Sequence, residues 1–193
     1  MASDGFKDDL HGYLRGARDA LMWKLDGLGE YDLRRPLTPT GTNLLGLVKH
    51  STGSHVRYLG EVFGRDLGVP LPWSSASEPN VDLWATPDET TKDIVARYRD
   101  ACSAGDATIE ELDLDAAGRV PWWGDEVVTL HHVLAHLTSE TQRHAGHADI
   151  VRELIDGSAG LLPVMSNLPT DDSSWWAGRR QRIEDAARKA ADG

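Results

Sequence analysis

The chain has 193 residues and a mass of 21.1 kDa, which suits a single domain spanning residues 1–193. Its formal net charge is −11, from 20 basic and 31 acidic residues, whereas nucleic-acid binders usually carry a basic surface, so we expect no nucleic-acid partner. The single cysteine, Cys102, excludes a disulfide framework and a zinc site built of cysteines alone.

The hydropathy pattern argues against contact with a membrane. No apolar run approaches the ~20 residues that cross a bilayer. The acidic start of the chain lacks the apolar stretch of a secretory signal. We therefore expect a cytoplasmic protein.

Four long segments show helical periodicity, and no convincing run alternates apolar and polar residues as a half-buried strand does. These segments cover about 5–28, 43–63, 86–112 and 129–156, and a shorter basic one follows over 175–191. The pattern therefore predicts an all-α chain of four long helices with an additional C-terminal helix.

The ends of two helices carry local signals. Residues 86–89, Thr-Pro-Asp-Glu, predict an N-cap at Thr86 with proline at the first helical position. Thr129 predicts the N-cap of the fourth helix and Gly157 its end. The linkers between the helices are long and contain tryptophan, so we expect them to pack against the helices.

The fourth helix carries a stripe of titratable side chains. At 100° per residue, His136, Glu140, His144 and His147 fall within about 80° of one another and border the apolar face. An unpaired imidazole or carboxylate in that position is costly, and a bound metal would supply a partner. A Glu–His pair four residues apart is also an ordinary helix ion pair, so spacing alone leaves both interpretations open.

A metal site needs ligands from more than one helix. Glu140 and His144 reach the same point beside their helix, and His50, at the edge of the apolar face of the second helix, is the best third ligand. One carboxylate and two imidazoles suit zinc, nickel or ferrous iron. His136 is interpreted mainly as a packing residue beside the ligands, and His147 as either such a neighbour or an alternative ligand. His11, by contrast, is expected to be exposed.

Several stretches resemble the mycothiol-dependent branch of the DinB-like superfamily, which includes enzymes similar to mycothiol-dependent maleylpyruvate isomerase. The main motifs are Leu-Val-Lys-His at 47–50 and Glu-Thr-Gln-Arg-His-Ala-Gly-His-Ala-Asp at 140–149, supported by residues 21–28, 34–41 and 167–169. The resemblance implies a four-helix bundle with long crossover loops, often a homodimer. It also implies one divalent metal per chain, zinc first and nickel or iron as alternatives, held by His50, Glu140 and His144.

The resemblance further implies a metal-dependent S-transferase that activates a low-molecular-weight thiol, such as mycothiol, for attack on an electrophilic small molecule. The alternatives are a thiol-dependent isomerase of the maleylpyruvate type, metal-assisted hydrolysis, and a non-catalytic metal-binding module of a stress response. Cys102 lies on a predicted core face, so the thiol is expected to come from outside the protein.

Two further residues are candidates for catalysis. His55 stands where relatives often have an acidic residue, and it could line the cavity and act as a neutral donor or base. Arg143 could bind an acidic group of the thiol or the substrate, or form a surface ion pair. No residue can be assigned to thiol binding from the sequence.

Overall fold

The computed structural model describes residues 2–76 and 78–192 and is mostly helical. The long helices are α1 (Ala2–Trp23), α3 (Leu44–Leu59), α4 (Thr91–Glu111), α5 (Leu130–Asp156) and α6 (Ser173–Ala191). A short helix, α2 (Glu30–Arg34), lies between α1 and α3, where the sequence analysis placed only a break.

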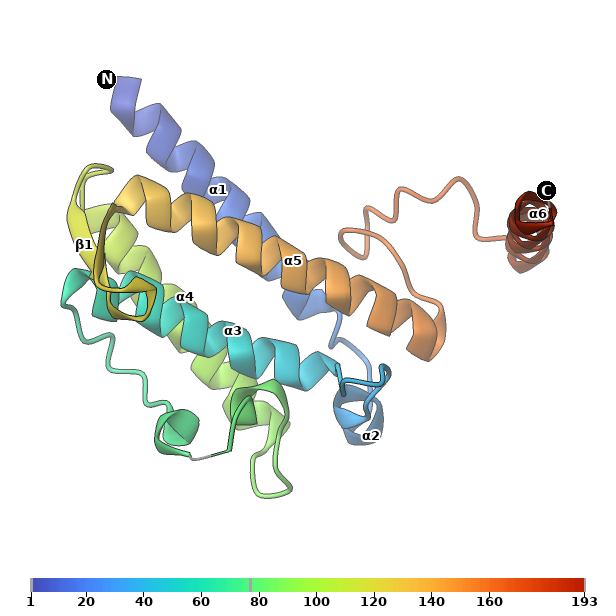
Figure 1. The fold of residues 1–193 in the computed structure, drawn as a ribbon, viewed down its shortest axis with the longest axis horizontal. Helices are drawn as coiled ribbons and strands as arrows, with labels where there is room; N and C mark the ends of the chain where they lie inside the picture. The colour runs from blue at the N-terminus through green and yellow to red at the C-terminus, as the bar shows by residue number, and fades with distance from the viewer. Residues whose placement is uncertain (1, 77, 193) are drawn as a thin grey trace.

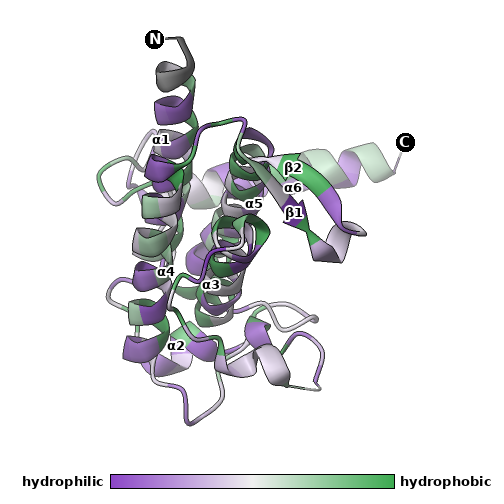
Figure 2. Ribbon diagram, turned by 90° about the vertical axis from the view of Figure 1, so that its left-hand side faces the viewer, coloured by the Kyte–Doolittle hydropathy of each residue, from purple (hydrophilic) through white to green (hydrophobic). Residues whose placement is uncertain are grey.

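Helix α5 lies beside both α1 and α3, and α3 also packs against α4 (Figure 1). Purple and green segments alternate along α1 and α4 in Figure 2, as expected of amphipathic helices that bury one face. No helix in the described part of the chain combines the length and the apolar character that crossing a membrane requires.

The buried apolar residues form two clusters along this helix packing. One includes Leu21, Leu44, Leu45, Val48, Ile94, Tyr98 and Ala148. The other includes Leu14, Leu59, Ile109, Val120, Val128, Val133, Leu134 and Leu137. Both clusters draw on α1, α3, α4 and α5, so these four helices hold the core.

The predicted helical character is confirmed, but the structure also contains two short strands that were not predicted. Strands β1 (Ala117–Val120) and β2 (Glu126–Thr129) form an antiparallel hairpin in which Val120 lies opposite Glu126. The strands are only four residues long, so alternation is too short to stand out in the sequence. A Cβ at Gly118 would lie 2.6 Å from the Cγ1 atom of Val62, so glycine lets the hairpin approach the short 3-10 helix Glu61–Phe63 that follows α3.

The predicted ends of α5 are confirmed, whereas the predicted start of α4 was wrong. The Thr129 hydroxyl accepts a hydrogen bond from the His132 amide, and α5 ends at Gly157, whose φ is 80°. Helix α4 begins at Thr91, where the Thr90 side chain caps the Asp93 amide. Residues 86–89 form a turn instead, in which the Glu89 amide donates to the Thr86 carbonyl oxygen and the Glu89 carboxylate accepts from the Thr86 amide.

Helix α6 lies apart from the rest of the molecule, at the end of a long connection from α5 (Figure 1). It begins at Ser173, two residues before the predicted start, and it has no buried residue among those described. The Asp172 side chain caps it by accepting a hydrogen bond from the Ser174 amide at 2.8 Å. Its basic residues therefore face solvent.

Candidate functional site

The three predicted metal ligands lie near one another where α3 and α5 run side by side. The rings of His50 on α3 and His144 on α5 meet edge to face, with centroids 4.8 Å apart. The Oε2 atom of Glu140 lies 3.7 Å from the Nε2 atom of His144. Two turns of α5 and one turn of α3 thus bring a carboxylate and two imidazoles together.

His144 is the least satisfied polar side chain of this group. Both of its ring nitrogens are buried and have no hydrogen-bond partner among the described residues. Burial, helped by the nearby His50, lowers the pKa of His144 to about 4, so the ring is neutral near pH 7. A neutral imidazole has a free lone pair, which is the form that binds a metal.

The three side chains do not converge on a single point. Within residues 2–76 and 78–192, no group of three or more His, Cys, Asp or Glu side chains is arranged to hold a metal ion. The Nδ1 atom of His50 is already engaged, at 2.7 Å from the Oδ2 atom of Asp82. The donor chemistry therefore fits a divalent metal, whereas the metal itself stays a prediction.

A cavity of about 490 Å³ opens beside this group. His50 and Glu140 contribute to its lining, and the remaining lining residues come from α3, the 65–85 loop, the hairpin turn and α5. They include the aromatic residues Tyr58, Trp73 and Trp122 and the charged residues Arg57, Glu78 and Asp82. A small molecule bound there would contact aromatic faces and charged groups at the same time.

The two histidines expected beside the ligands differ in their surroundings. His136 lines the cavity, and its Nε2 atom lies 3.0 Å from the Tyr58 hydroxyl, which also accepts a hydrogen bond from the Trp122 indole. Burial lowers the pKa of His136. His147 is exposed, and its ring centroid lies 5.7 Å from that of His144. His136 therefore forms part of the cavity wall together with Tyr58, and His147 lies at the outer edge of the group formed by His50, Glu140 and His144.

The structure does not bring His55 to the cavity. Its side chain is fully buried between α1, α3 and α4, and its Nδ1 atom lies 2.7 Å from the Ser51 carbonyl oxygen. Its Nε2 atom accepts a hydrogen bond from Arg18 at 2.9 Å. Burial and the Arg18 charge lower the pKa of His55 to about 3. Five residues after His50, it faces another side of α3, because five residues turn a helix by about 140° more than a full turn.

Three other residues of the sequence analysis can now be placed. His11 was expected to be exposed, but it is buried, with its Nε2 atom 2.8 Å from the Oδ1 atom of Asp106 on α4. Arg143 is exposed on α5, and its role in binding an acidic group stays a prediction. Cys102 is partly buried, and burial raises the pKa of its thiol to about 11, which makes it a poor nucleophile near neutral pH.

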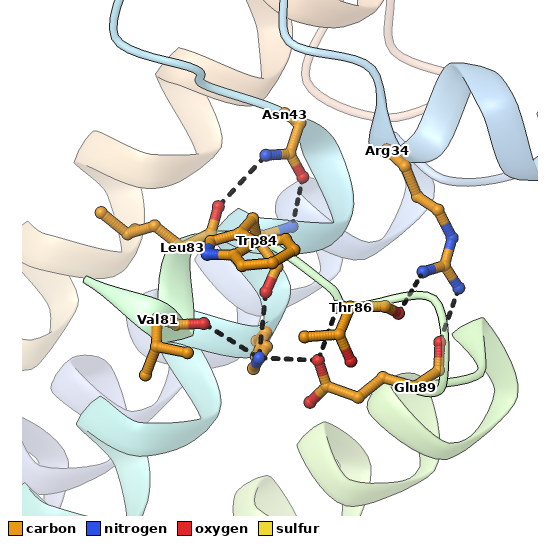
Figure 3. Close-up of polar contacts among 9 residues, drawn as sticks. Arg34, Asn43, Val81, Leu83, Trp84, Thr86 and Glu89 are labelled. Carbon is orange, nitrogen blue, oxygen red and sulfur yellow. Dashed lines mark hydrogen bonds and ion pairs between the residues drawn. The ribbon is translucent and has the colours of Figure 1, made fainter. Parts of the chain in front are cut away.

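Two residues of the site region, Asp82 and Lys49, were not predicted from the sequence. Asp82 comes from the loop between α3 and α4, and its hydrogen bond from His50 holds the pKa of its carboxyl below the ordinary value. Lys49 is buried, and its ammonium group binds the carboxylate of Glu89 and two carbonyl groups of the same loop (Figure 3). A lysine inside a buried helical face was the one available signal, since such a charge needs partners.

A sequence model of the family described as mycothiol S-transferase matches residues 9–157. The matched range includes His50, Asp82, Glu140 and His144, and it ends at the residue that stops α5. No curated protein matches the chain significantly. The match confirms the predicted resemblance to the mycothiol-dependent branch of the DinB-like superfamily, and the chain belongs to the mycothiol S-transferase family.

Proposed function

We propose that the protein transfers the thiol of mycothiol to an electrophilic small molecule in the cavity beside His50. Membership of the mycothiol S-transferase family supports a transferase that uses mycothiol. In this proposal His50, Glu140 and His144 hold one divalent metal, zinc in the first instance. We take α1, α3, α4 and α5 as the four helices of a DinB-like bundle, with α6 as an addition to it.

The observation that carries the metal site is the state of His144. Two buried ring nitrogens without partners are costly, because each donor or acceptor has lost its water without gaining a protein contact. The lowered pKa of His144 keeps its ring neutral near pH 7, and the side chains of His50 and Glu140 both lie close to that ring. A metal bound by these residues would lower the pKa of a coordinated thiol and keep it nucleophilic near neutral pH.

The protein's own residues supply binding and positioning. Tyr58, Trp73 and Trp122 offer flat apolar faces for ring-shaped parts of the thiol or the electrophile. His136 orients the Tyr58 hydroxyl from the cavity wall. In the reaction the thiol loses its proton to water, its sulfur forms a bond to the electrophilic carbon, and the leaving group departs with the bonding electrons.

The first test measures metal content in protein purified without a histidine tag, for the wild type and for His144→Ala. We expect about one divalent metal per wild-type chain and none in the variant. A wild type that stays metal-free after reconstitution with zinc, nickel and iron would overturn the metal site. His131→Ala serves as the control, because His131 is an exposed histidine at the start of the same helix.

A second test measures turnover of mycothiol with monobromobimane as the electrophile. We expect turnover in the wild type that requires both the thiol and the metal and is lost in His144→Ala. Turnover without any thiol would favour hydrolysis instead. We also propose that the protein is a homodimer, and analytical ultracentrifugation tests this by measuring its mass in solution.

A further inference from the structure

The loop before α4 is fastened to α3 through a buried ammonium group. The Nζ atom of Lys49 donates to the carbonyl oxygens of Val81 at 3.0 Å and Trp84 at 2.9 Å, and to the Glu89 carboxylate at 2.8 Å (Figure 3). These three contacts use all three of its donor hydrogens. The side chain is almost completely buried, so the contacts are shielded from water.

Two further contacts fix the loop between these points. The side-chain amide of Asn43 donates a hydrogen bond to the Leu83 carbonyl oxygen at 3.1 Å (Figure 3). A Cβ atom at Gly46 would lie 1.9 Å from the same oxygen, so the loop rests directly on the α3 backbone. We call the contacts of Lys49, Asn43 and Gly46 with residues 81–84 the α3 clamp.

A second cation holds the turn that follows. Arg34 of α2 donates to the carbonyl oxygens of Thr86 at 3.1 Å and Glu89 at 2.7 Å (Figure 3). The Glu89 carboxylate also accepts a hydrogen bond from the Thr86 amide at 2.9 Å. The loop is therefore held at successive backbone positions on both sides of Asp82.

Asp82 lies between the clamped residues, and its carboxylate meets the Nδ1 atom of His50 at 2.7 Å. An ionised carboxylate only accepts hydrogen bonds, so Nδ1 of His50 carries the hydrogen. The lone pair of a neutral imidazole then lies on Nε2. A carboxylate partner of this kind also fixes the ring orientation and raises the basicity of the free nitrogen.

We propose that Asp82 is a positioning residue that the α3 clamp delivers to His50, where it selects the tautomer with a free Nε2 atom for metal binding. The part that concerns metal binding rests on the proposed function, whereas the tautomer does not. The inference extends the site from its three ligands to a loop of 65–85 that contributes none of them.

The test of metal binding compares zinc affinities of chelator-stripped protein by competition with a chromogenic chelator. We expect Asp82→Ala to weaken zinc binding about 10- to 100-fold, the range seen when such a partner is lost. Asp82→Asn should weaken it less, because the amide oxygen still accepts a hydrogen bond from Nδ1. Glu78→Gln removes the same charge from the same cavity without contact to His50, and it should leave zinc affinity near that of the wild type.

Cobalt distinguishes a positioning residue from a ligand. The visible spectrum of Co²⁺ reports the number and type of ligands, so Asp82→Ala should lower the affinity and leave the shape of the spectrum unchanged. A change to the spectrum of a site with one ligand fewer would overturn the positioning role.

The tautomer can be measured without any metal. Long-range ¹H–¹⁵N NMR spectra separate the two neutral tautomers of histidine, and the His50 signals are identified by their absence in His50→Gln. We expect the Nδ1–H form in the metal-free wild type and a shift toward the Nε2–H form in Asp82→Ala. An Nε2–H wild type would overturn the inference.

The clamp is tested by Gly46→Ala, which alters neither Asp82 nor His50. The added methyl group must displace Leu83, so zinc affinity should fall in the same direction as in Asp82→Ala, with helix content unchanged by circular dichroism. If the wild type binds zinc and all Asp82 variants bind it equally well, the inference fails and the proposed function stands. If the wild type binds no metal at all, both fail for metal binding, and the NMR result alone decides the tautomer.

Discussion

Two groups of polar side chains lie on different sides of α3, and they contrast in how completely they are satisfied. The core cluster, His11, Arg18, His55 and Asp106, joins α1, α3 and α4. The cavity cluster, His50, Asp82, Glu140 and His144, joins α3, α5 and the 65–85 loop. Both ring nitrogens of His55 have hydrogen-bond partners, whereas neither ring nitrogen of His144 has one among the described residues. In the described part of the chain, the core cluster does contain one buried nitrogen without a partner, Nη2 of Arg18, which bonds through its other two nitrogens.

The contrast shows that a displaced pKa does not by itself mark a functional site. The pKa of His55 is lowered to about 3 and that of His144 to about 4, in both cases mainly by burial. The larger pKa shift therefore belongs to His55 of the core cluster, which does not line the cavity. The cavity cluster is distinguished by an imidazole with both nitrogens unsatisfied and by its place beside an open cavity, which together indicate a missing ligand.

The largest expected effect comes from breaking the core cluster. Arg18→Met removes the hydrogen bonds to His55 and Asp106 and leaves the buried His55 and the half-buried Asp106 without that partner. We expect the free energy of unfolding to fall by about 1–3 kcal/mol, the range for leaving a buried hydrogen-bonding group unsatisfied. Urea unfolding measures this loss, and zinc affinity of the folded variant should stay unchanged. If the free energy of unfolding falls by less than about 1 kcal/mol, the contacts of Arg18 contribute no more than an exposed ion pair does.

The pH dependence of stability should also follow the core cluster. The unfolded chain protonates His55 near its ordinary value of 6.5, and the folded protein does so only near pH 3. The free energy of unfolding therefore falls as the pH drops through this window, by about 1.4 kcal/mol per pH unit for this one group. His55→Gln, which keeps an acceptor for Arg18, should show a slope shallower by that amount in metal-free urea titrations. Equal slopes would contradict the buried neutral state of His55.

Removing His144 should have the opposite effect on stability. His144→Leu replaces two unsatisfied buried nitrogens with an apolar side chain of similar size, so the metal-free protein should gain about 1 kcal/mol. Chemical denaturation in the presence of a chelator measures this gain, and zinc binding should be lost in the same variant. A destabilised metal-free variant would mean that His144 has protein partners after all.

The smallest effect is expected at Cys102. Because burial raises the pKa of its thiol to about 11, Cys102→Ala should keep the kcat/KM of the wild type with mycothiol. Native protein should also react slowly with iodoacetamide. Rapid alkylation with loss of turnover would show that the protein supplies its own nucleophile.

Much of the helical architecture could be predicted because each helix carries its own periodic signal. Thr129 and Gly157 mark α5 at single positions, and the four-residue spacing of Glu140 and His144 places both on one face. His50 could be chosen because it borders the apolar face of α3. These inferences need only the geometry of one helix at a time.

The missed features depend on contacts between elements distant in sequence. His11 is buried because Asp106 of α4 reaches it, and nothing in the sequence of α1 signals that partner. Glu89 makes the expected bond to the Thr86 amide, but its carboxylate also binds Lys49 of α3, and no local signal in residues 86–89 indicates that partner. Asp82 had no local signal, since its place depends on the clamp that holds its neighbours.

The clamp has a consequence for how relatives of this protein can diverge. Lys49 and Asn43 bind peptide oxygens of residues 81, 83 and 84 and not their side chains. Of these residues Val81 also lines the cavity, so a substitution there changes the cavity lining while the chain path that carries Asp82 is retained. Substrate preference can therefore change in evolution through the loop side of the cavity, while Asp82 still fixes the orientation of His50.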